Sequence, residues 1–261
     1  MRIEFNPYLI APRNISGVKF NTGISHTNFG KTVPKDSFQN TSLERFFNEN
    51  YVRSMIASNY EAQNILKKNN ITSGLNLKEL KDLKNNHMRV TSDICERIAN
   101  NLPQALKDTV NMKDLQEAAM LHDFGKVLIP PEILNKNGKL TPEELKVMRF
   151  HSELGYQLLK KEGLNENVLN LIRNHHNNLT SGGKFVYDVD LQILNLADKY
   201  SALTEKRVYK DAMSPTQALT TLAAEVRDRK VHPLVFNALV KSINSNPFAN
   251  LDTVNLPANI A

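Results

Sequence analysis

The sequence predicts an all-α protein, a bundle of helices with polar side chains projecting inward. Two observations lead to this prediction. Apolar residues recur at three- and four-residue spacing in one segment after another, which is the period of an amphipathic helix. No sustained alternation of apolar and polar residues indicates a sheet, and only a short stretch near 185–189 is typical of a strand.

The N-terminal part of the chain predicts a tail followed by two helical segments. Residues 1–42 are rich in Asn, Ser, Thr, Gly and Pro and lack periodicity, so we expect a flexible tail. A helical pattern runs from Leu43 to Leu66, and residues 69–74 break it. A second helix is expected over about 78–99, and Pro103 ends it. We expect one helical domain over 43–245, with 43–75 as an N-terminal helical extension and 246–261 as a C-terminal tail.

Six further helices follow, at about 113–123, 142–161, 166–177, 188–204, 214–227 and 233–244. Thr141 precedes Pro142 and two acidic residues, which is the pattern of a helix N-cap followed by proline at the first helical position. Ser214 and Pro215 repeat this pattern. Gly138 is interpreted as a turn glycine, and Gly163 as a glycine that ends a helix.

The composition excludes several classes of protein. No apolar run approaches about 18 residues, so no membrane span is expected. The N-terminus has no secretory leader pattern, and the single cysteine, Cys95, excludes an intrachain disulfide, so we expect a cytoplasmic protein with Cys95 in a helix core. The net charge of +6 is not concentrated in a basic run, so no nucleic-acid partner is expected. A mild positive field suits a small phosphorylated substrate.

Histidine and aspartate side chains interrupt several of the apolar stripes. His87 shares a helical face with positions 91, 94 and 98, and His122, His151 and Asp198 lie in similar stripes. Each one alone fits a hydrogen-bonded core residue, whereas a shared metal site satisfies all of them together. Imidazole and carboxylate are ligands for zinc, manganese and iron. The adjacent pair His175–His176 points to two ions, or to one ligand and one hydrogen-bonding partner of a ligand.

Two long runs resemble a known family. The runs HDFGKVLIPPEILNKNGKLTPEELKVMRFHSELG and LADKYSALTEKRVYKDAMSPTQAL resemble the HD superfamily of metal-dependent phosphohydrolases, and within it the HD-GYP branch of cyclic di-GMP phosphodiesterases. The resemblance covers about residues 80–240. It implies an all-helical bundle around a centre of two or three metal ions.

The resemblance also assigns residues to roles. The implied metal ligands are His87, His122, Asp123, His151, His175, His176 and Asp198, with Asp123 bridging two ions. A competing alignment places Thr91 in the position of His87, and we prefer His87. Lys126 matches a lysine that contacts the substrate phosphate, and Arg207 and Lys210 match basic residues near the substrate.

The chain departs from the branch at several positions. The Gly-Tyr-Pro motif is absent, Asn177 replaces a glutamate, and Gly182-Gly183-Lys184 stands in a shortened loop. Leu83 occupies the place of an acid that supports a third ion, so we expect two divalent ions. Ser201 stands where a second aspartate is common. That change is tolerable because Asp198 is the ligand candidate, whereas the changes around the missing Gly-Tyr-Pro motif put cyclic di-GMP specificity in doubt.

We therefore expect a metal-dependent phosphodiesterase acting on a cyclic dinucleotide or a nucleotide. Two cations that hold a bridging hydroxide let it attack phosphorus, while Asp123 bridges the ions and Lys126 neutralises charge. Mixed nitrogen and oxygen ligands accept iron, manganese and zinc alike, so the sequence does not identify the metal. The alternatives are a nucleotide phosphomonoesterase and a signalling module that binds metal or a cyclic dinucleotide without turnover. Phe46, Phe47 and Tyr51 pack onto the bundle, which we favour, or bind a partner protein or a second subunit in a homodimer.

Overall fold

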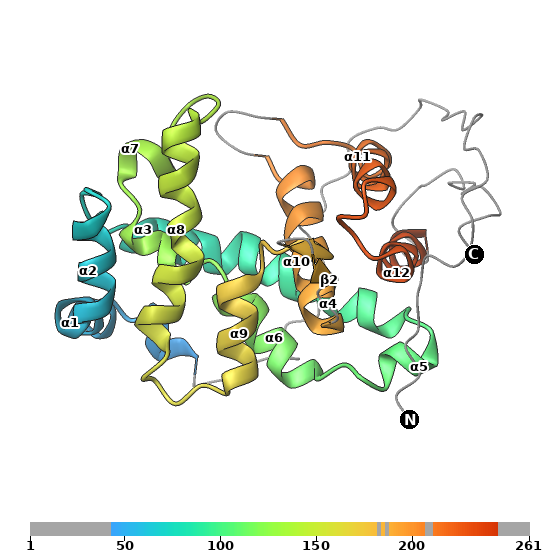
Figure 1. Cartoon of the computed structure of the whole chain (residues 1–261), viewed down its shortest axis with the longest axis horizontal. Coiled ribbons are helices and arrows are strands. Elements are labelled where there is room, and N and C mark those ends of the chain that lie inside the picture. Colours follow the sequence, from blue (N-terminus) through green and yellow to red (C-terminus); the bar gives the residue numbers. More distant parts are fainter. Residues whose placement is uncertain (1–42, 182–183, 186–187, 207–210, 245–261) are drawn as a thin grey trace.

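The structure is a computed structural model that describes residues 43–181, 184–185, 188–206 and 211–244 (Figure 1). These residues fold mainly into helices, which confirms the predicted fold class. Their one sheet is a short hairpin of β1 (Thr180–Ser181) and β2 (Lys184–Phe185), so the strand expected near 185–189 is met only at Phe185. None of the helices in these ranges combines the length and apolarity needed to cross a bilayer. The predicted domain boundaries stay predictions, because the segments outside them are not described.

The helices in chain order are η1 (Glu44–Phe47), α1 (Glu49–Ser58), α2 (Tyr60–Lys68), α3 (Leu77–Leu83), η2 (Lys84–Met88), α4 (Arg89–Asn100), α5 (Gln104–Lys107), α6 (Met112–Leu121), η3 (Phe124–Leu128), α7 (Pro131–Leu134), α8 (Pro142–Leu159), α9 (Glu166–Asn174), α10 (Val189–Thr204), α11 (Pro215–Arg227) and α12 (Pro233–Asn244). The short helices α5, η3 and α7 were not predicted. Each is four or five residues long, which is too short to show a helical period in the sequence.

The prediction of one continuous helix over 43–66 is wrong, because two asparagines divide this segment. The Asn48 side chain accepts a hydrogen bond from the Tyr51 backbone N–H and caps α1. The Asn59 side chain caps α2 in the same way and also donates to the carbonyl of Gln157 on α8. Asparagine favours such caps over helix interiors, so three short helices, η1, α1 and α2, replace one long one.

The N-terminal segment packs onto the bundle, which was the favoured interpretation. Phe46 and Phe47 are buried and meet the ring of Phe124 edge to face, with ring centroids 6.1 and 6.5 Å apart. The Tyr51 hydroxyl donates a hydrogen bond to the carboxylate of Glu162, beyond the end of α8. These contacts place the aromatic residues inside the fold.

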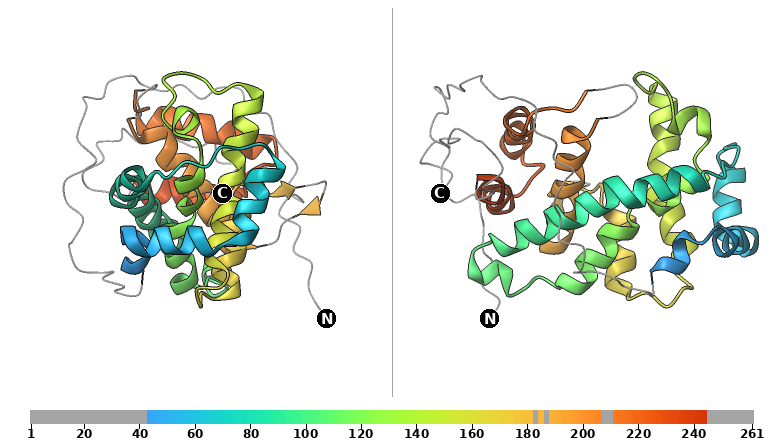
Figure 2. Two further views of the ribbon diagram at one scale, coloured as in Figure 1. Left: turned by 90° about the vertical axis from the view of Figure 1, so that its left-hand side faces the viewer. Right: turned by 180° about the vertical axis from the view of Figure 1, so that it is seen from behind.

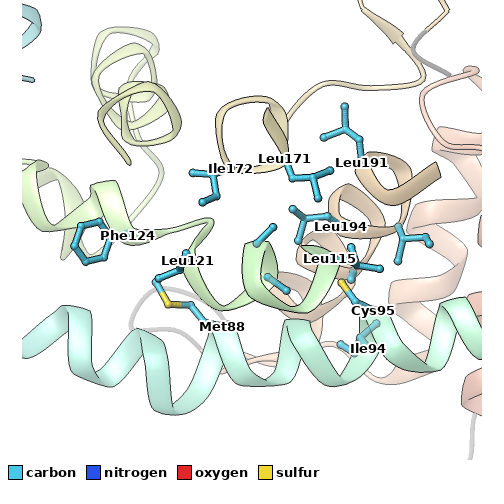
Figure 3. Packing of buried hydrophobic residues seen from close by; sticks show 14 of the residues in the cluster. Met88, Ile94, Cys95, Leu115, Leu121, Phe124, Leu171, Ile172, Leu191 and Leu194 are labelled. Atoms are coloured by element: carbon cyan, nitrogen blue, oxygen red, sulfur yellow. The ribbon is translucent and has the colours of Figure 1, made fainter. Parts of the chain in front are cut away.

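The run from α3 through η2 to α4 forms the spine of the bundle, seen as one long rod in the right-hand view of Figure 2. The α4 part packs against α6, α10 and α12. Met88, Ile94 and Cys95 project from this run toward Leu115 and Leu121 of α6 (Figure 3). Burial of Cys95 confirms its predicted place in the core and raises the pKa of its thiol.

A close backbone contact joins η3 to α8. A Cβ atom added to Gly125 would lie 2.0 Å from the carbonyl oxygen of His151 and 2.5 Å from the backbone nitrogen of Gly155. Only glycine permits this approach. The Asn76 side chain, just before α3, holds η3 from the other side by donating to the carbonyls of Lys126 and Ile129. The segment carrying Lys126 is thereby fixed against the helix carrying His151.

The predicted caps and turns are confirmed. Thr141 and Ser214 each form a capping box, with Glu144 and Gln217 respectively, directly before a proline. Gly163, after α8, has a φ of +76°, in the left-handed region that favours glycine. The two capping boxes mark where α8 and α11 begin.

Candidate metal centre

Seven predicted ligands come together where six elements of the bundle meet. They are His87 from η2, His122 and Asp123 from the junction of α6 and η3, His151 from α8, His175 and His176 from the end of α9, and Asp198 from α10. The predicted face of His87 with Thr91, Ile94 and Ile98 is buried. The η2 segment is a single π-helical turn, a local widening that is frequent at functional sites.

The histidines and Asp198 form two groups with Asp123 between them. His87, His122 and Asp198 make one group, and His151, His175 and His176 make the other; within each, one potential ligand atom per residue lies within 4.8 Å of the others. One carboxylate oxygen of Asp123, Oδ2, lies 3.5 Å from Nε2 of both His87 and His122. Its other oxygen, Oδ1, lies 3.3 Å from Nε2 of His151. One carboxylate therefore faces both groups.

Backbone carbonyls fix the orientation of three imidazoles. Nδ1 of His122, His151 and His175 lies 2.8, 2.6 and 2.7 Å from the carbonyl oxygen of the residue three positions earlier. A carbonyl only accepts, so in the neutral ring the hydrogen sits on Nδ1 and the Nε2 lone pair faces the centre. Metal-binding histidines are held in this way.

The inward-facing nitrogens lack partners that would satisfy them. Nε2 of His122 is fully buried and accepts no hydrogen bond from the described residues. Nε2 of His151 and Nε2 of His175, both lone-pair bearing, lie only 3.2 Å apart. Such an arrangement is unfavourable unless a cation lies between the lone pairs. The residues present therefore fit a metal, and the mixed nitrogen and oxygen donors fit a first-row divalent ion.

The second group is poised as neutral ligands. Burial lowers the pKa of His151 to about 3. The Asp123 carboxylate raises this pKa, and the nearby Lys126 ammonium lowers it again in part. Burial, together with the neighbouring His176, holds the pKa of His175 well below its usual range. A neutral imidazole is the form that binds metal, so this group needs no deprotonation.

His87 behaves in the opposite way. Burial lowers the pKa of His87, but the carboxylates of Asp198 and Glu205 outweigh burial and raise the pKa above its usual value, to about 9. Asp198 Oδ1 lies 3.0 Å from Nε2, and Glu205 Oε2 lies 3.0 Å from Nδ1. The Ser201 hydroxyl, at the position where a second aspartate is common, donates to Glu205 and lies 3.1 Å from Nδ1 of His87. Without metal, His87 therefore holds a proton at the place where an ion would bind.

Both carboxylates of the centre are ionised. Burial raises the pKa of Asp123, but the Lys126 ammonium and the surrounding imidazoles outweigh burial and hold it well below its usual range. The Lys126 Nζ donates to Asp123 Oδ2 at 2.6 Å. Burial also raises the pKa of Asp198, and the imidazoles of His122 and His87 bring it below the usual range. The centre thus sets two ionised carboxylates among the imidazoles, beside the Lys126 ammonium.

Two residues of the centre were missed by sequence reasoning. Asn195 donates a hydrogen bond to the carbonyl of His175 at 2.7 Å, and Glu205 holds His87. The polar residues 195, 198, 201 and 205 repeat at spacings of three, three and four along α10 and its C-cap. That period marks one helical face, so it was a usable signal for both residues.

Other predicted residues fall outside the centre or outside the described ranges. Arg207, Lys210, Gly182 and Gly183 lie outside the described residues. Asn177 hydrogen-bonds to Asn174 through its backbone and its side chain and lines the cavity described next. Leu83 lines the same cavity as an apolar residue, and Thr91 is buried outside the two ligand groups.

A cleft of about 1050 Å³ opens onto the centre. Its floor includes His87, Asp123, Lys126, His151 and Asp198. The volume is at the upper end of the range for small-molecule sites, which is about 300–1,000 Å³. The cleft therefore has room for a ligand larger than a single phosphate.

The chain is 35% identical over 136 residues to the cyclic di-GMP phosphodiesterase response regulator RpfG of Xanthomonas campestris, which covers 49% of this chain and 35% of that protein. It is 27% identical over 177 residues to the 3'3'-cGAMP-specific phosphodiesterase 1 of Vibrio cholerae, covering 66% of this chain and 40% of that protein. The chain thus spans well under half the length of both relatives.

A solved structure, the HDG"Y"P protein Bd1817 from Bdellovibrio bacteriovorus, superposes with a TM-score of 0.48 at 20% identity, covering 77% of this chain and 67% of that chain. The sequence profile of the family described as HD domain matches residues 55–234. That match takes in more than half of the chain and every residue of the two ligand groups. This chain belongs to the HD domain family.

Proposed function

We propose that this chain is a metal-dependent phosphodiesterase that hydrolyses a cyclic dinucleotide with two divalent ions. The observation that carries the proposal is the position of Asp123, whose two carboxylate oxygens face two separate groups of three ligands. A carboxylate shared in this way is the arrangement expected between two ions a few ångströms apart.

The ligands divide between the ions as the two groups do. His87, His122 and Asp198 would hold one ion, and His151, His175 and His176 the other, with Asp123 shared. Iron, manganese and zinc all suit these donors. When bound, the ions supply Lewis acidity, which activates water and neutralises charge on the phosphoryl oxygens.

The chain's own groups orient the substrate. The Lys126 ammonium, now 2.6 Å from Asp123, reaches the floor of the cleft and would turn to a non-bridging phosphate oxygen once cations neutralise that carboxylate. Arg207 and Lys210 stay our candidates for gripping a second phosphate, since arginine suits bidentate phosphate binding.

The substrate class rests on the cleft and on the relatives. RpfG is named for cyclic di-GMP and the Vibrio protein for 3'3'-cGAMP, so both act on cyclic dinucleotides. A cleft of about 1050 Å³ accommodates such a ligand above the centre. The missing Gly-Tyr-Pro motif leaves the choice of base to other residues.

Elemental analysis of the purified chain, paired with hydrolysis of bis(p-nitrophenyl) phosphate under manganese, iron(II) and zinc, tests the proposal. We expect about two metals per chain and metal-dependent turnover. The double variant His122→Ala/Asp123→Ala should lose both, whereas His232→Ala, which removes a histidine outside the centre, should keep both. Metal without turnover would indicate a binding module, and faster hydrolysis of p-nitrophenyl phosphate than of the diester would indicate a phosphomonoesterase. No metal under any loading would overturn the site assignment.

A further inference from the structure

His87 is oriented differently from the other buried histidines of the centre. Nδ1 of His122, of His151 and of His175 each faces the backbone carbonyl of the residue three positions earlier. Among the described residues, no backbone carbonyl bonds to Nδ1 of His87. This ring comes from the π-helical turn η2, and the groups that meet its Nδ1 are side chains.

Those side chains come from the end of α10. Oε2 of Glu205 lies 3.0 Å from Nδ1 of His87, and the Ser201 hydroxyl lies 3.1 Å from the same nitrogen. The side chains of His87 and Glu205 are only 4% and 23% exposed, so their contact is largely shielded from water. A charged acceptor makes a shorter and stronger hydrogen bond than a neutral one. The Glu205 carboxylate is therefore the group that fixes this ring.

Ser201 fixes Glu205 in turn. Its hydroxyl donates to Oε1 of Glu205 at 2.7 Å, which leaves Oε2 facing His87. The backbone N–H of Glu205 also donates to the Ser201 carbonyl at 2.9 Å and closes the last turn of α10. Because the Ser201 hydroxyl is so close to Nδ1, an aspartate at position 201 would set its carboxylate against the same nitrogen. The chain supplies that carboxylate from four residues further along.

The same helix meets the other side of the ring. Oδ1 of Asp198 lies 3.0 Å from Nε2 of His87, so α10 holds both ring nitrogens. With Nδ1 bonded to Glu205, Nε2 is turned toward the group that His87 forms with His122 and Asp198. A carboxylate bonded to the outer nitrogen also makes an imidazole a stronger metal ligand. Glu205 thus sets both the orientation and the donor strength of His87.

We infer that Glu205 is a positioning residue of the metal centre, which acts through His87 and replaces the aspartate missing at position 201. The inference rests on the proposed function, since it needs the two-ion centre. It applies to one ion only. The ion of the His87 group depends on Glu205, whereas His151 and His175 of the other group are held by their own carbonyls.

Zinc affinity of the full chain, measured by competition with a chromogenic chelator, tests the inference. Glu205→Ala should weaken one of the two ions by about 10–100-fold and leave the other unchanged. The exchange variant Ser201→Asp/Glu205→Ser returns a carboxylate to Nδ1 and should restore that affinity to within about threefold. A role of Glu205 in the general fold would not be rescued in this way. The matched control Glu166→Ala removes an exposed acid of α9 outside the cleft and should leave both affinities unchanged.

Proton NMR of the metal-free chain gives a second readout. An Nδ1–H that donates to a shielded carboxylate should give a downfield, slowly exchanging signal. Glu205→Ala should remove the signal of His87, and the exchange variant should restore it. Glu205→Gln keeps the length of the side chain with a neutral acceptor, so its zinc affinity should fall between those of the wild type and Glu205→Ala.

Three outcomes would overturn the inference. They are wild-type affinity for both ions in Glu205→Ala, equal weakening of both ions in that variant, and a folded exchange variant that binds no better than Glu205→Ala. If the exchange variant does not fold, Glu205→Gln decides, since wild-type affinity there would show that the carboxylate is not needed. A wild-type chain that binds no zinc, manganese or iron would count against the proposed function, while the NMR signal still decides whether Glu205 orients His87.

Discussion

The contact between Gly125 and α8 lets a single methyl group test how the metal centre is assembled. In Gly125→Ala the new Cβ would lie 2.0 Å from the His151 carbonyl oxygen. Carbon–oxygen contacts begin at about 3.3 Å, so η3 and α8 must separate by roughly 1.3 Å. Asp123 lies two residues before this glycine, and His151 is on the other side of the contact.

After that movement, the ligand atoms of Asp123 and His151 would lie too far apart for one ion to bind both. Asp123 Oδ1 and His151 Nε2 are now 3.3 Å apart, and the separation would take them to roughly 4.6 Å. Two atoms bound to one first-row ion at about 2.0–2.2 Å lie at most about 4.4 Å apart. We therefore expect loss of the ion held by the group of His151. Overpacking of this kind costs about 1–3 kcal/mol, which lowers Tm by about 3–10 °C in a domain of this size.

Gly155→Ala is the matched control. Its Cβ would lie 3.2 Å from the Gly125 nitrogen and 3.5 Å from a methyl group of Ile172, which needs a shift of only a few tenths of an ångström. Alanine also gains up to about 1 kcal/mol over glycine inside a helix, so the net change should be small. Metal content by elemental analysis and Tm with and without chelator measure both variants. A Gly125→Ala protein that keeps its full metal content and its Tm would refute the reasoning.

Three further predictions concern the centre. In metal-free protein, the pKa of His87 is raised to about 9 by Asp198 and Glu205 against the effect of burial, so the stability it contributes is present below about pH 6.5 and is lost as pH rises through 9. Chemical denaturation between pH 6 and 10 should show this loss, and metal affinity should rise with pH over the same window because the ion displaces the proton. Lys126→Met should lower kcat for bis(p-nitrophenyl) phosphate by about 10²-fold or more with metal content retained, and an unchanged kcat would contradict its phosphate role. Lys199 bonds Asn178 and Glu225 at 2.8 and 2.7 Å and so ties the segment after His176 to α11; Lys199→Ala should weaken metal binding by about tenfold, which competition with a chromogenic chelator would measure.

Much of the metal centre could be predicted because its residues break a regular pattern. His87 and Asp198 each interrupt an apolar stripe, and a stripe shows which side of a helix faces inward. The helix signals at Thr141 and Ser214 are local, so the sequence alone identifies them. Grouping all seven candidate ligands together required the resemblance to a family, since periodicity does not show which helices meet.

What could not be predicted depends on contacts between distant segments. The π-helical turn at His87 is one widened turn, which the 3.6-residue pattern of the sequence does not reveal. Asn48 and Asn59 divide the first helix because Asn59 also binds a carbonyl 98 residues away. The Gly125 contact likewise joins two backbones that are separate in the sequence. Tertiary contacts of this kind override local propensity.

The candidate ligands come from segments far apart in the chain, with His87 and Asp198 separated by 111 positions. An ion bound there would crosslink the middle of the protein, and it would bind only when every segment is in place. Cells starved of the metal would then hold a chain with a loosened interior, open to proteases at its centre. Metal supply would thus set how many copies survive, as well as how many are active.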